Sequence, residues 1–157
     1  MRVTIERSAF LKALNHVQSV VERRNTIPVL SNVLVQAKQG VVKLTATDLD
    51  IEIVETVAAE TAREGAATVP AHMLYDIVRK LPDGAQLQLE QGPDSSRVAI
   101  TAGRSKFALQ ALPAEDFPDL SSGEFGNTFA LPAASLKFLI EKTRFAISTE
   151  ETRYYLN

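Results

Sequence analysis

Residues 69–74, Val-Pro-Ala-His-Met-Leu, recur as Leu-Pro-Ala-Ala-Ser-Leu at residues 131–136 and, in apolar pattern only, as Ile-Glu-Arg-Ser-Ala-Phe at residues 5–10. The three copies begin at residues 5, 69 and 131, which are 64 and then 62 residues apart. Proline suits the first turn of a helix, where its missing N–H would have no partner. Each copy therefore predicts an extended segment that leads into a helix, and the near-equal spacing indicates an internal repeat.

Apolar residues continue behind each copy at helical spacing, as in Phe10, Leu14, Val17 and Val21. This period predicts amphipathic helices. After the first two helices the apolar residues alternate with polar ones, which is typical of strands with one solvated face. The expected helices span 7–24, 72–81 and 134–145, and the expected strands span 32–37, 41–47, 51–58, 85–90, 97–101 and 106–112.

Short connections predict antiparallel hairpins, so the fold class is α+β, with doubled helix-plus-antiparallel-strand units and helices on one face of the sheets. We expect one domain over residues 1–120, built from two repeats of about 1–60 and 61–120. Residues 121–127 are the expected linker. Residues 128–157 begin a third repeat without most of its strands, so we expect the truncated opening of a second domain and a chain that is a fragment of a longer protein.

The composition excludes several classes of protein. The chain has 157 residues, no cysteine and a formal net charge of −2. Disulfides, zinc-thiolate sites and thiol nucleophiles are therefore excluded, and a uniformly basic nucleic-acid binder is disfavoured. No apolar run approaches the roughly 18 residues of a membrane-spanning helix. The charged N-terminus disfavours a secretory signal, so we expect a cytoplasmic protein without a membrane partner.

Positive charge is concentrated on the expected helices. Their net charges are +3, +1 and +2, which sum to +6 and leave −8 for the rest of the chain. Lys12 and Arg23 lie opposite the apolar stripe of the first helix, as Arg79 and Lys80 do on the second. Basic helix faces on an acidic body focus positive potential on one surface, which predicts sequence-independent contact with DNA phosphates.

The chain resembles, over its whole length, the N-terminal part of the bacterial DNA polymerase III beta subunits, the replicative sliding clamps. The motifs that carry the resemblance are TIPVLSN at 26–32, LTATDLD at 44–50, VPA at 69–71, GRSKF at 103–107, LPAEDFP at 112–118 and RYYLN at 153–157. The resemblance implies a clamp fold with three similar domains per chain. Two chains close into a homodimeric ring around duplex DNA.

The same resemblance implies a processivity factor rather than an enzyme, with no catalytic residues, cofactor or metal. Its expected partners are double-stranded DNA, a second clamp subunit, the replicative polymerase and the clamp loader. Its expected place is the bacterial cytoplasm, in association with the nucleoid.

The resemblance also implies residue roles. Arg24 corresponds to a loop arginine that touches DNA, and Arg23 adds a second charge beside it. The resemblance further implies a subunit interface at Ile77, Leu81, Arg104, Lys106, Phe107 and Leu109, and part of a cleft that binds partner peptides at Arg153, Tyr155 and Leu156. The helix charge pattern adds Lys12, Arg79 and Lys80 for DNA, and Tyr154 is a further candidate because its ring could stack on nucleobases.

Two other functions are compatible with the residues. Asp48, Asp50 and Glu52 are spaced to share one strand face and could hold a divalent metal, as in a metal-dependent nuclease. A protein-interaction module without DNA contact is the second alternative. His16 and His72 lie on polar helix faces, where we expect them to meet solvent or phosphate rather than act as catalytic bases.

Overall fold

The computed structural model describes residues 1–22, 26–92, 95–119 and 129–148. Its contacts divide the chain into two units, Met1–Leu120 and Ser121–Asn157, and each is described by itself. The elements of the first unit are β1 (Arg2–Glu6), α1 (Arg7–Val17), β2 (Asn32–Lys38), β3 (Val41–Thr47), β4 (Glu52–Ala58), β5 (Glu60–Arg63), β6 (Gly65–Pro70), α2 (Ala71–Lys80), β7 (Gln86–Glu90), β8 (Arg97–Ala102) and β9 (Ser105–Gln110).

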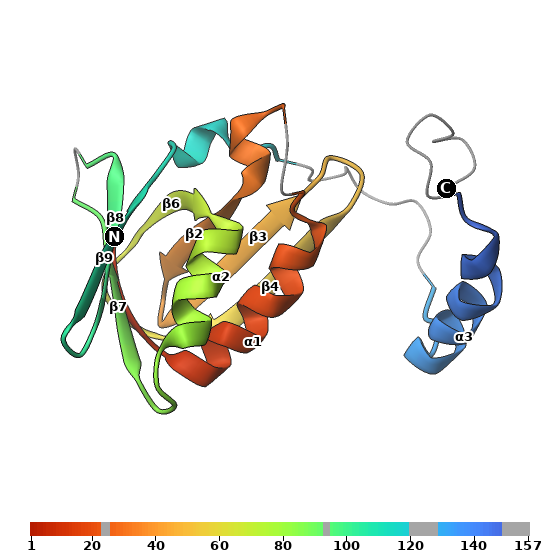
Figure 1. The fold of residues 1–157 in the computed structure, drawn as a ribbon, viewed down its shortest axis with the longest axis horizontal. Helices are drawn as coiled ribbons and strands as arrows, with labels where there is room; N and C mark the ends of the chain where they lie inside the picture. Colours follow the sequence, from red (N-terminus) through yellow and green to blue (C-terminus); the bar gives the residue numbers. More distant parts are fainter. Residues whose placement is uncertain (23–25, 93–94, 120–128, 149–157) are drawn as a thin grey trace. The chain divides into compact units, whose positions relative to one another are not determined.

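The strands form two antiparallel sheets, with orders β5-β1-β7-β8-β9 and β4-β3-β2-β6. Helices α1 and α2 contact each other and run side by side on the same side of the four-stranded sheet (Figure 1). This arrangement confirms the predicted α+β class, in which both helices cover one face of the sheets. The described part of this unit also contains the short 3-10 turns η1 (Gln18–Val20), η2 (Pro28–Ser31) and η3 (Ala114–Asp116).

The two repeats exchange their leading strands. β1 precedes α1 in the chain but pairs with β7 of the second repeat, with Ile5 opposite Leu87. β6 precedes α2 but pairs with β2 of the first repeat, with Val69 opposite Val33. Strand β5, which the sequence did not predict, pairs with the free edge of β1. Each sheet therefore needs strands from both repeats, and the two repeats form one domain rather than two.

The main core lies between the helices and the sheets. The predicted apolar stripe of α1 is buried, since Phe10, Leu14 and Val17 are inaccessible to solvent. Leu74 and Val78 of α2 are equally buried and belong to the same cluster. Complete burial of each such side chain contributes about 1.5–3 kcal/mol. The helix faces opposite these residues consequently point to solvent.

Helix α1 is shorter than predicted. It ends at Val17 and passes into η1, so the expectation of a helix to residue 24 is wrong. The Ser19 hydroxyl donates to the His16 carbonyl, which competes with the helical hydrogen-bond pattern. Val21 then adopts an extended conformation, as β-branched residues prefer, and remains buried. The charge of Glu22 therefore lies beyond the helix.

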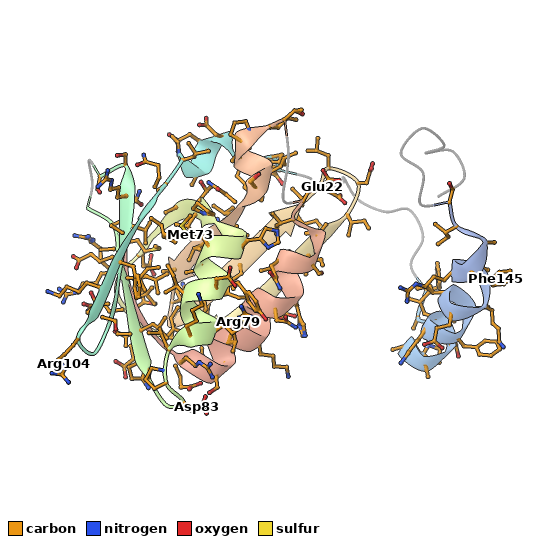
Figure 2. All side chains as sticks on the ribbon, in the orientation of Figure 1. Glu22, Met73, Arg79, Asp83, Arg104 and Phe145 are labelled. Carbon is orange, nitrogen blue, oxygen red and sulfur yellow. The ribbon has the colours of Figure 1, made fainter. Side chains whose placement is uncertain are left out.

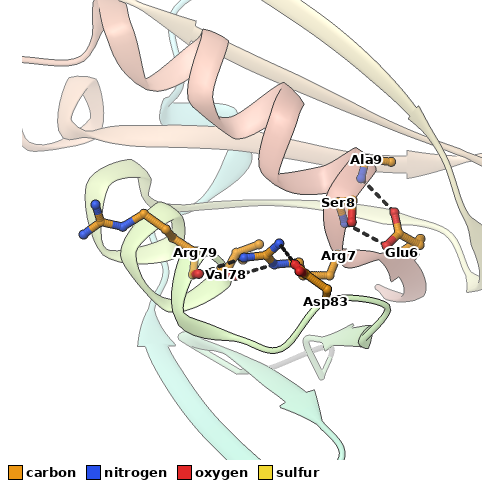
Figure 3. A network of polar contacts seen from close by, with 7 residues as sticks. All are labelled: Glu6, Arg7, Ser8, Ala9, Val78, Arg79 and Asp83. Atoms are coloured by element: carbon orange, nitrogen blue, oxygen red, sulfur yellow. Dashed lines mark hydrogen bonds and ion pairs between the residues drawn. The ribbon is translucent and has the colours of Figure 1, made fainter.

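Glu6 caps the N-terminus of α1 (Figure 3). Its carboxylate accepts hydrogen bonds from the backbone N–H groups of Ser8 and Ala9, both at 2.8 Å. These N–H groups have no partner within the helix, so the side chain satisfies donors that would otherwise remain free. The bond from Ser8, followed by that from Ala9, lowers the pKa of the Glu6 carboxyl below its usual value.

The cap predicts a pH dependence of stability. The pKa of Glu6 in the folded chain is below the unfolded value of about 4.3. The stabilisation of the fold by the ionised cap is therefore complete above the unfolded pKa and is lost as the pH falls through the folded pKa. We expect Glu6→Gln to be less stable than the parent chain at pH 7, and the difference to shrink as the pH falls below about 4.3, measured by urea unfolding. Glu6→Asp retains the cap and serves as the control. An equal loss for Glu6→Gln above and below this pH contradicts the prediction.

The second unit contains α3 (Ala133–Thr143) and a 3-10 turn, η4 (Arg144–Ala146). These bounds lie close to the predicted helix over 134–145. Lys137 and Glu141 form an ion pair at 3.8 Å, and the Lys142 ammonium lies 5.3 Å from the Phe138 ring centroid. Within the described ranges, no helix is both long and apolar enough to cross a membrane.

Candidate nucleic-acid and subunit interfaces

The outer face of the helix layer carries three of the predicted DNA-binding residues. Lys12 is exposed on α1, and Arg79 and Lys80 are exposed in the last turn of α2. Because α1 and α2 pack against each other on the same side of the sheets, these cations belong to one layer of the molecule. Figure 2 labels Arg79 on α2, beside α1. The helix layer thus presents spaced positive charges that can contact the phosphates of a nucleic-acid backbone.

Two contacts hold Arg79 in place. Its guanidinium lies 3.1 Å from the Asp76 carboxylate and 5.6 Å from the Tyr75 ring centroid. Both side chains of the ion pair are about half exposed, so the pair contributes little to stability and leaves the charge accessible. The aromatic ring orders the guanidinium on the outer face. Arg79 is therefore a preordered cation whose charge Asp76 partly offsets.

Arg7 does not contribute to the outer face, although it was counted in the helix charge of +3. Its side chain is only 13% exposed. Nε donates to the Val78 carbonyl at 3.2 Å, Nη2 donates to the Arg79 carbonyl at 2.8 Å, and Nη1 contacts Asp83 (Figure 3). The first residue of α1 therefore caps the last turn of α2, where the Val78 carbonyl otherwise accepts only from the Leu81 N–H.

An acidic residue borders the helix layer where sequence reasoning placed none. Glu55 on β4 lies with one carboxylate oxygen 2.6 Å from His16 Nδ1. Glu55 and Lys12 also line the same shallow depression between α1 and β4. The strand acids are thus not all turned away from the helices, because β4 is an edge strand that flanks α1 directly. The helix face is less basic than the helical wheel indicated.

A groove of about 550 Å³ separates α2 from β9 and brings together three predicted interface residues, Ile77, Leu81 and Phe107. Ile77 is half-buried and Phe107 is 38% exposed, so both present apolar surface to the groove. Met73, which sequence reasoning missed, is 54% exposed beside them. An apolar residue on the polar side of an amphipathic helix was the signal that could have identified it. The full lining is His72, Met73, Asp76, Ile77, Lys80, Leu81, Ser105 and Phe107.

The other predicted interface residues have different environments. Arg104 and Lys106 are exposed in and after the turn that precedes β9. Leu109 is 3% exposed and belongs to the core, so its side chain is not part of an open surface. Leu81 is also buried and forms the floor of the groove. β9 itself ends the strand order of the five-stranded sheet, and a strand edge is a template for pairing with another chain.

Six predicted site residues lie outside the residues that the structure describes. They are Arg23, Arg24, Arg153, Tyr154, Tyr155 and Leu156.

The carboxylates of Asp48, Asp50 and Glu52 do not share a strand face, so this expectation was wrong. Residues 48–51 form the turn between β3 and β4, and only Glu52 belongs to a strand. Asp48 Oδ1 accepts hydrogen bonds from the N–H groups of Asp50 and Ile51 and thereby stabilises the turn. Among the described residues, no three His, Cys, Asp or Glu side chains are grouped to hold a metal ion. The nuclease alternative is not supported.

The same fold occurs in solved structures of DNA clamps. A crystal structure of the DNA polymerase sliding clamp from Caulobacter crescentus superposes with a TM-score of 0.92 at 57% sequence identity, over all of this chain and 42% of that chain. A sliding clamp from Pseudomonas aeruginosa superposes with a TM-score of 0.90 at 42% identity, over 100% of this chain and 42% of that one. The first unit is therefore a DNA-clamp domain.

The particular family follows from the sequence. The family model for the DNA polymerase III beta subunit, N-terminal domain, matches residues 1–121, and the chain belongs to this family. The beta sliding clamp of Caulobacter vibrioides is 57% identical over all of this chain and 42% of that protein. The beta sliding clamp of Escherichia coli K12 is 42% identical over all of this chain and 43% of that protein. The chain thus spans less than half the length of these relatives.

Proposed function

We propose that this chain supplies the first domain of a ring-shaped sliding clamp, which encircles duplex DNA and acts as a non-catalytic processivity factor for the replicative polymerase. The single observation that carries the proposal is the division of the first unit into a helix layer with exposed cations and sheets on the other side. Cations without base-reading partners suit a protein that must slide, because phosphate contacts carry no sequence information.

For the DNA side, the proposal assigns phosphate contacts to Lys12, Arg79 and Lys80, together with Arg23 and Arg24 in the segment after η1. Tyr154 is proposed as a further DNA contact. These contacts are electrostatic and independent of sequence, so they hold the ring on the duplex without stopping its movement.

For the subunit interface, the proposal assigns the groove between α2 and β9 and the free edge of β9. Ile77 and Phe107 provide apolar contact, and Leu81 forms the floor of the groove beneath them. Arg104 and Lys106 provide charge. The backbone around Leu109 provides strand pairing. An interface of this kind holds the ring closed and still permits opening. The occupant is another copy of the full-length clamp.

The proposed domain assignment is a first clamp domain over residues 1–120, a linker over 121–127 and the opening of a second domain over 128–157. Arg153, Tyr155 and Leu156 are proposed as part of the cleft that binds peptides of the polymerase and the clamp loader. A processivity factor of this kind works in the bacterial cytoplasm at the nucleoid.

Topological retention on DNA tests the proposed function. The full-length protein that contains this chain, loaded on nicked circular DNA, should stay bound through gel filtration and should be lost when the DNA is linearised. We expect Phe107→Arg to abolish retention and to convert the dimer to a monomer in sedimentation, because a charge replaces an apolar contact in the interface. Ile51→Arg, which changes an exposed apolar residue of the first unit outside the proposed interface, is the matched control. Equal retention on circular and linear DNA contradicts the clamp function.

A further inference from the structure

His16 and Lys12 are exposed residues one turn apart on the outer face of α1. The His16 ring is held by a residue of a strand, because its Nδ1 lies 2.6 Å from Oε1 of Glu55 on β4. The side chain of His16 is 48% exposed and that of Glu55 is 33% exposed. Lys12 lines the same shallow depression as Glu55. The three side chains therefore form one group of charges on the flank of α1 that faces β4.

The Glu55 carboxylate determines which nitrogen of His16 carries the proton in the neutral ring. An ionised carboxylate only accepts hydrogen bonds, so Nδ1 carries a proton and donates to Glu55. Nε2 of the neutral ring then has a lone pair and no proton. Among the residues that the structure describes, Nε2 has no hydrogen-bond partner. Since about half of the His16 side chain is exposed, Nε2 is the ring nitrogen available to a ligand.

This arrangement makes a phosphate contact of His16 depend on protonation. Phosphate oxygens only accept hydrogen bonds, so the neutral ring offers them no donor. A second proton, on Nε2, creates that donor and changes the charge of the His16–Glu55 pair from −1 to zero. Histidine is the side chain whose ordinary titration falls between pH 5 and 8, so this change occurs near neutral pH.

Apart from Lys12 and Glu55, the charged residues on the elements packed against α1 lie away from His16. On the sheet, exposed residues alternate with residues that face the helices, so the remaining charges of β3 and β4 lie on its other face. The bonds of Arg7 place the end of α2 at the beginning of α1, where β1 also meets it (Figure 3). η1 has no charged residue. The residues concerned are Lys43 and Glu52 on the sheet, Arg2 and Glu6 on β1, and Asp76, Arg79 and Lys80 on α2, where Asp76 pairs with Arg79.

His72, at the beginning of α2, has a different environment. Its Nε2 lies 2.8 Å from the carbonyl oxygen of Val21, and its Nδ1 lies 3.1 Å from Oε1 of Gln18. Both ring nitrogens are engaged within the protein, so the expectation that His72 meets solvent or phosphate is wrong. The chain has two histidines, and His16 is the one that can still bind a phosphate.

We propose that His16 is a phosphate ligand of the helix layer, which binds DNA only when Nε2 is protonated, and that Glu55 is the positioning residue that orients its ring. The proposal rests on the proposed function, because it takes the helix layer as the DNA-binding face. It adds a ligand that responds to pH to a set of lysine and arginine ligands that stay charged. DNA binding by the clamp therefore strengthens as His16 gains its second proton.

Duplex affinity at pH 6 and at pH 8 tests the proposal in the full-length protein that contains this chain. One phosphate contact contributes roughly eightfold at 0.1 M salt, so His16→Gln should weaken binding by about 3- to 8-fold at pH 6 and by less than about twofold at pH 8. His16→Lys, which carries a permanent cation, should bind like the parent at pH 6 and more tightly than the parent at pH 8. Fluorescence anisotropy with a duplex oligonucleotide measures these ratios.

Two further variants separate a ligand from a structural contact. Asn15→Gln changes the exposed neighbour of His16 on α1 and should alter neither affinity. Glu55→Gln replaces the carboxylate by an amide that can also donate to Nδ1, so the neutral ring can carry its proton on Nε2. In this background, the cost of His16→Gln should depend less on pH.

An equal cost of His16→Gln at both pH values, or no cost at either, overturns the proposal and leaves the His16–Glu55 pair as a structural contact between α1 and β4. A His16→Lys variant that binds no more tightly than the parent at pH 8 also overturns it. Retention on circular DNA tests the clamp function separately. Retention by a protein whose His16 variants show no response to pH refutes this proposal and not the clamp function.

Discussion

Reversing the charges of Lys12, Arg79 and Lys80 to glutamate should lower the affinity of the full-length protein for duplex DNA by on the order of 100-fold or more at 0.1 M salt. Each phosphate contact contributes about 0.9 to the slope of log K against log salt, so three lost contacts flatten the slope by about 2.7 per subunit. The effect is electrostatic and should shrink steadily as the salt concentration rises. Fluorescence anisotropy across a salt series measures both quantities.

The matched control places the same charge change on the sheets. Lys38, Lys43 and Arg97 are exposed residues whose strand neighbours Ala37, Val42 and Val98 are buried in the core, so they point away from the helix layer. Their reversal to glutamate alters the net charge equally, and we expect it to change the affinity by less than about threefold, because screened charges at this distance act weakly. Equal losses from the two triple variants exclude the helix layer as the DNA-binding face.

The second large effect concerns stability. Arg7→Ala should lower the free energy of unfolding of the first unit by about 2–4 kcal/mol, because two hydrogen bonds from a charged donor are lost, and the Val78 carbonyl then keeps only its bond from the Leu81 N–H. The ion pair with Asp83 adds little, since the Asp83 side chain is 91% exposed. Urea unfolding of the 157-residue chain, followed by circular dichroism, gives the value.

Two variants distinguish the carbonyl contacts from the ion pair. Asp83→Ala removes only the exposed partner and should cost less than about 0.5 kcal/mol. Arg7→Lys keeps the charge but cannot bridge both carbonyls, so we expect an intermediate loss. An Arg7→Ala variant as stable as Asp83→Ala is incompatible with Arg7 acting as the cap of α2. Because Arg7 binds the Arg79 carbonyl, the same variant should also loosen the outer face of α2.

Much of the secondary structure is predictable because it follows from local patterns. Strand β3 spans the predicted residues 41–47, and the stripe from Phe10 to Val17 is buried. These features depend on the hydrophobic period of a few neighbouring residues. The end of α1 was misjudged for a local reason as well, since the Ser19 side chain competes with the helix and a wheel takes no account of such bonds.

The candidate site was less predictable, because the exposure and the ion pairing of each charged side chain depend on residues of other elements. Arg7 and Arg79 are both arginines on helices, but Arg7 is only 13% exposed and caps α2, whereas Arg79 is exposed over Tyr75. Glu55 approaches His16 from a strand 39 residues away. A helical wheel gives the direction of a side chain and not the element that meets it, so it placed His16 and Arg79 on solvated faces without showing their neighbours.

The amino-acid sequence by itself determined that the chain contains a repeated strand-and-helix unit with buried apolar stripes and cations on the opposite faces. Those properties arise from the order and period of residues along the chain. Only the tertiary structure decided that β1 and β6 exchange between the repeats and that α2 and β9 enclose a groove. It also decided that the side chains of Arg7 and His72 pair with backbone carbonyls far away in the sequence. Each depends on contacts between residues far apart in sequence, whose formation is governed by packing of the whole domain.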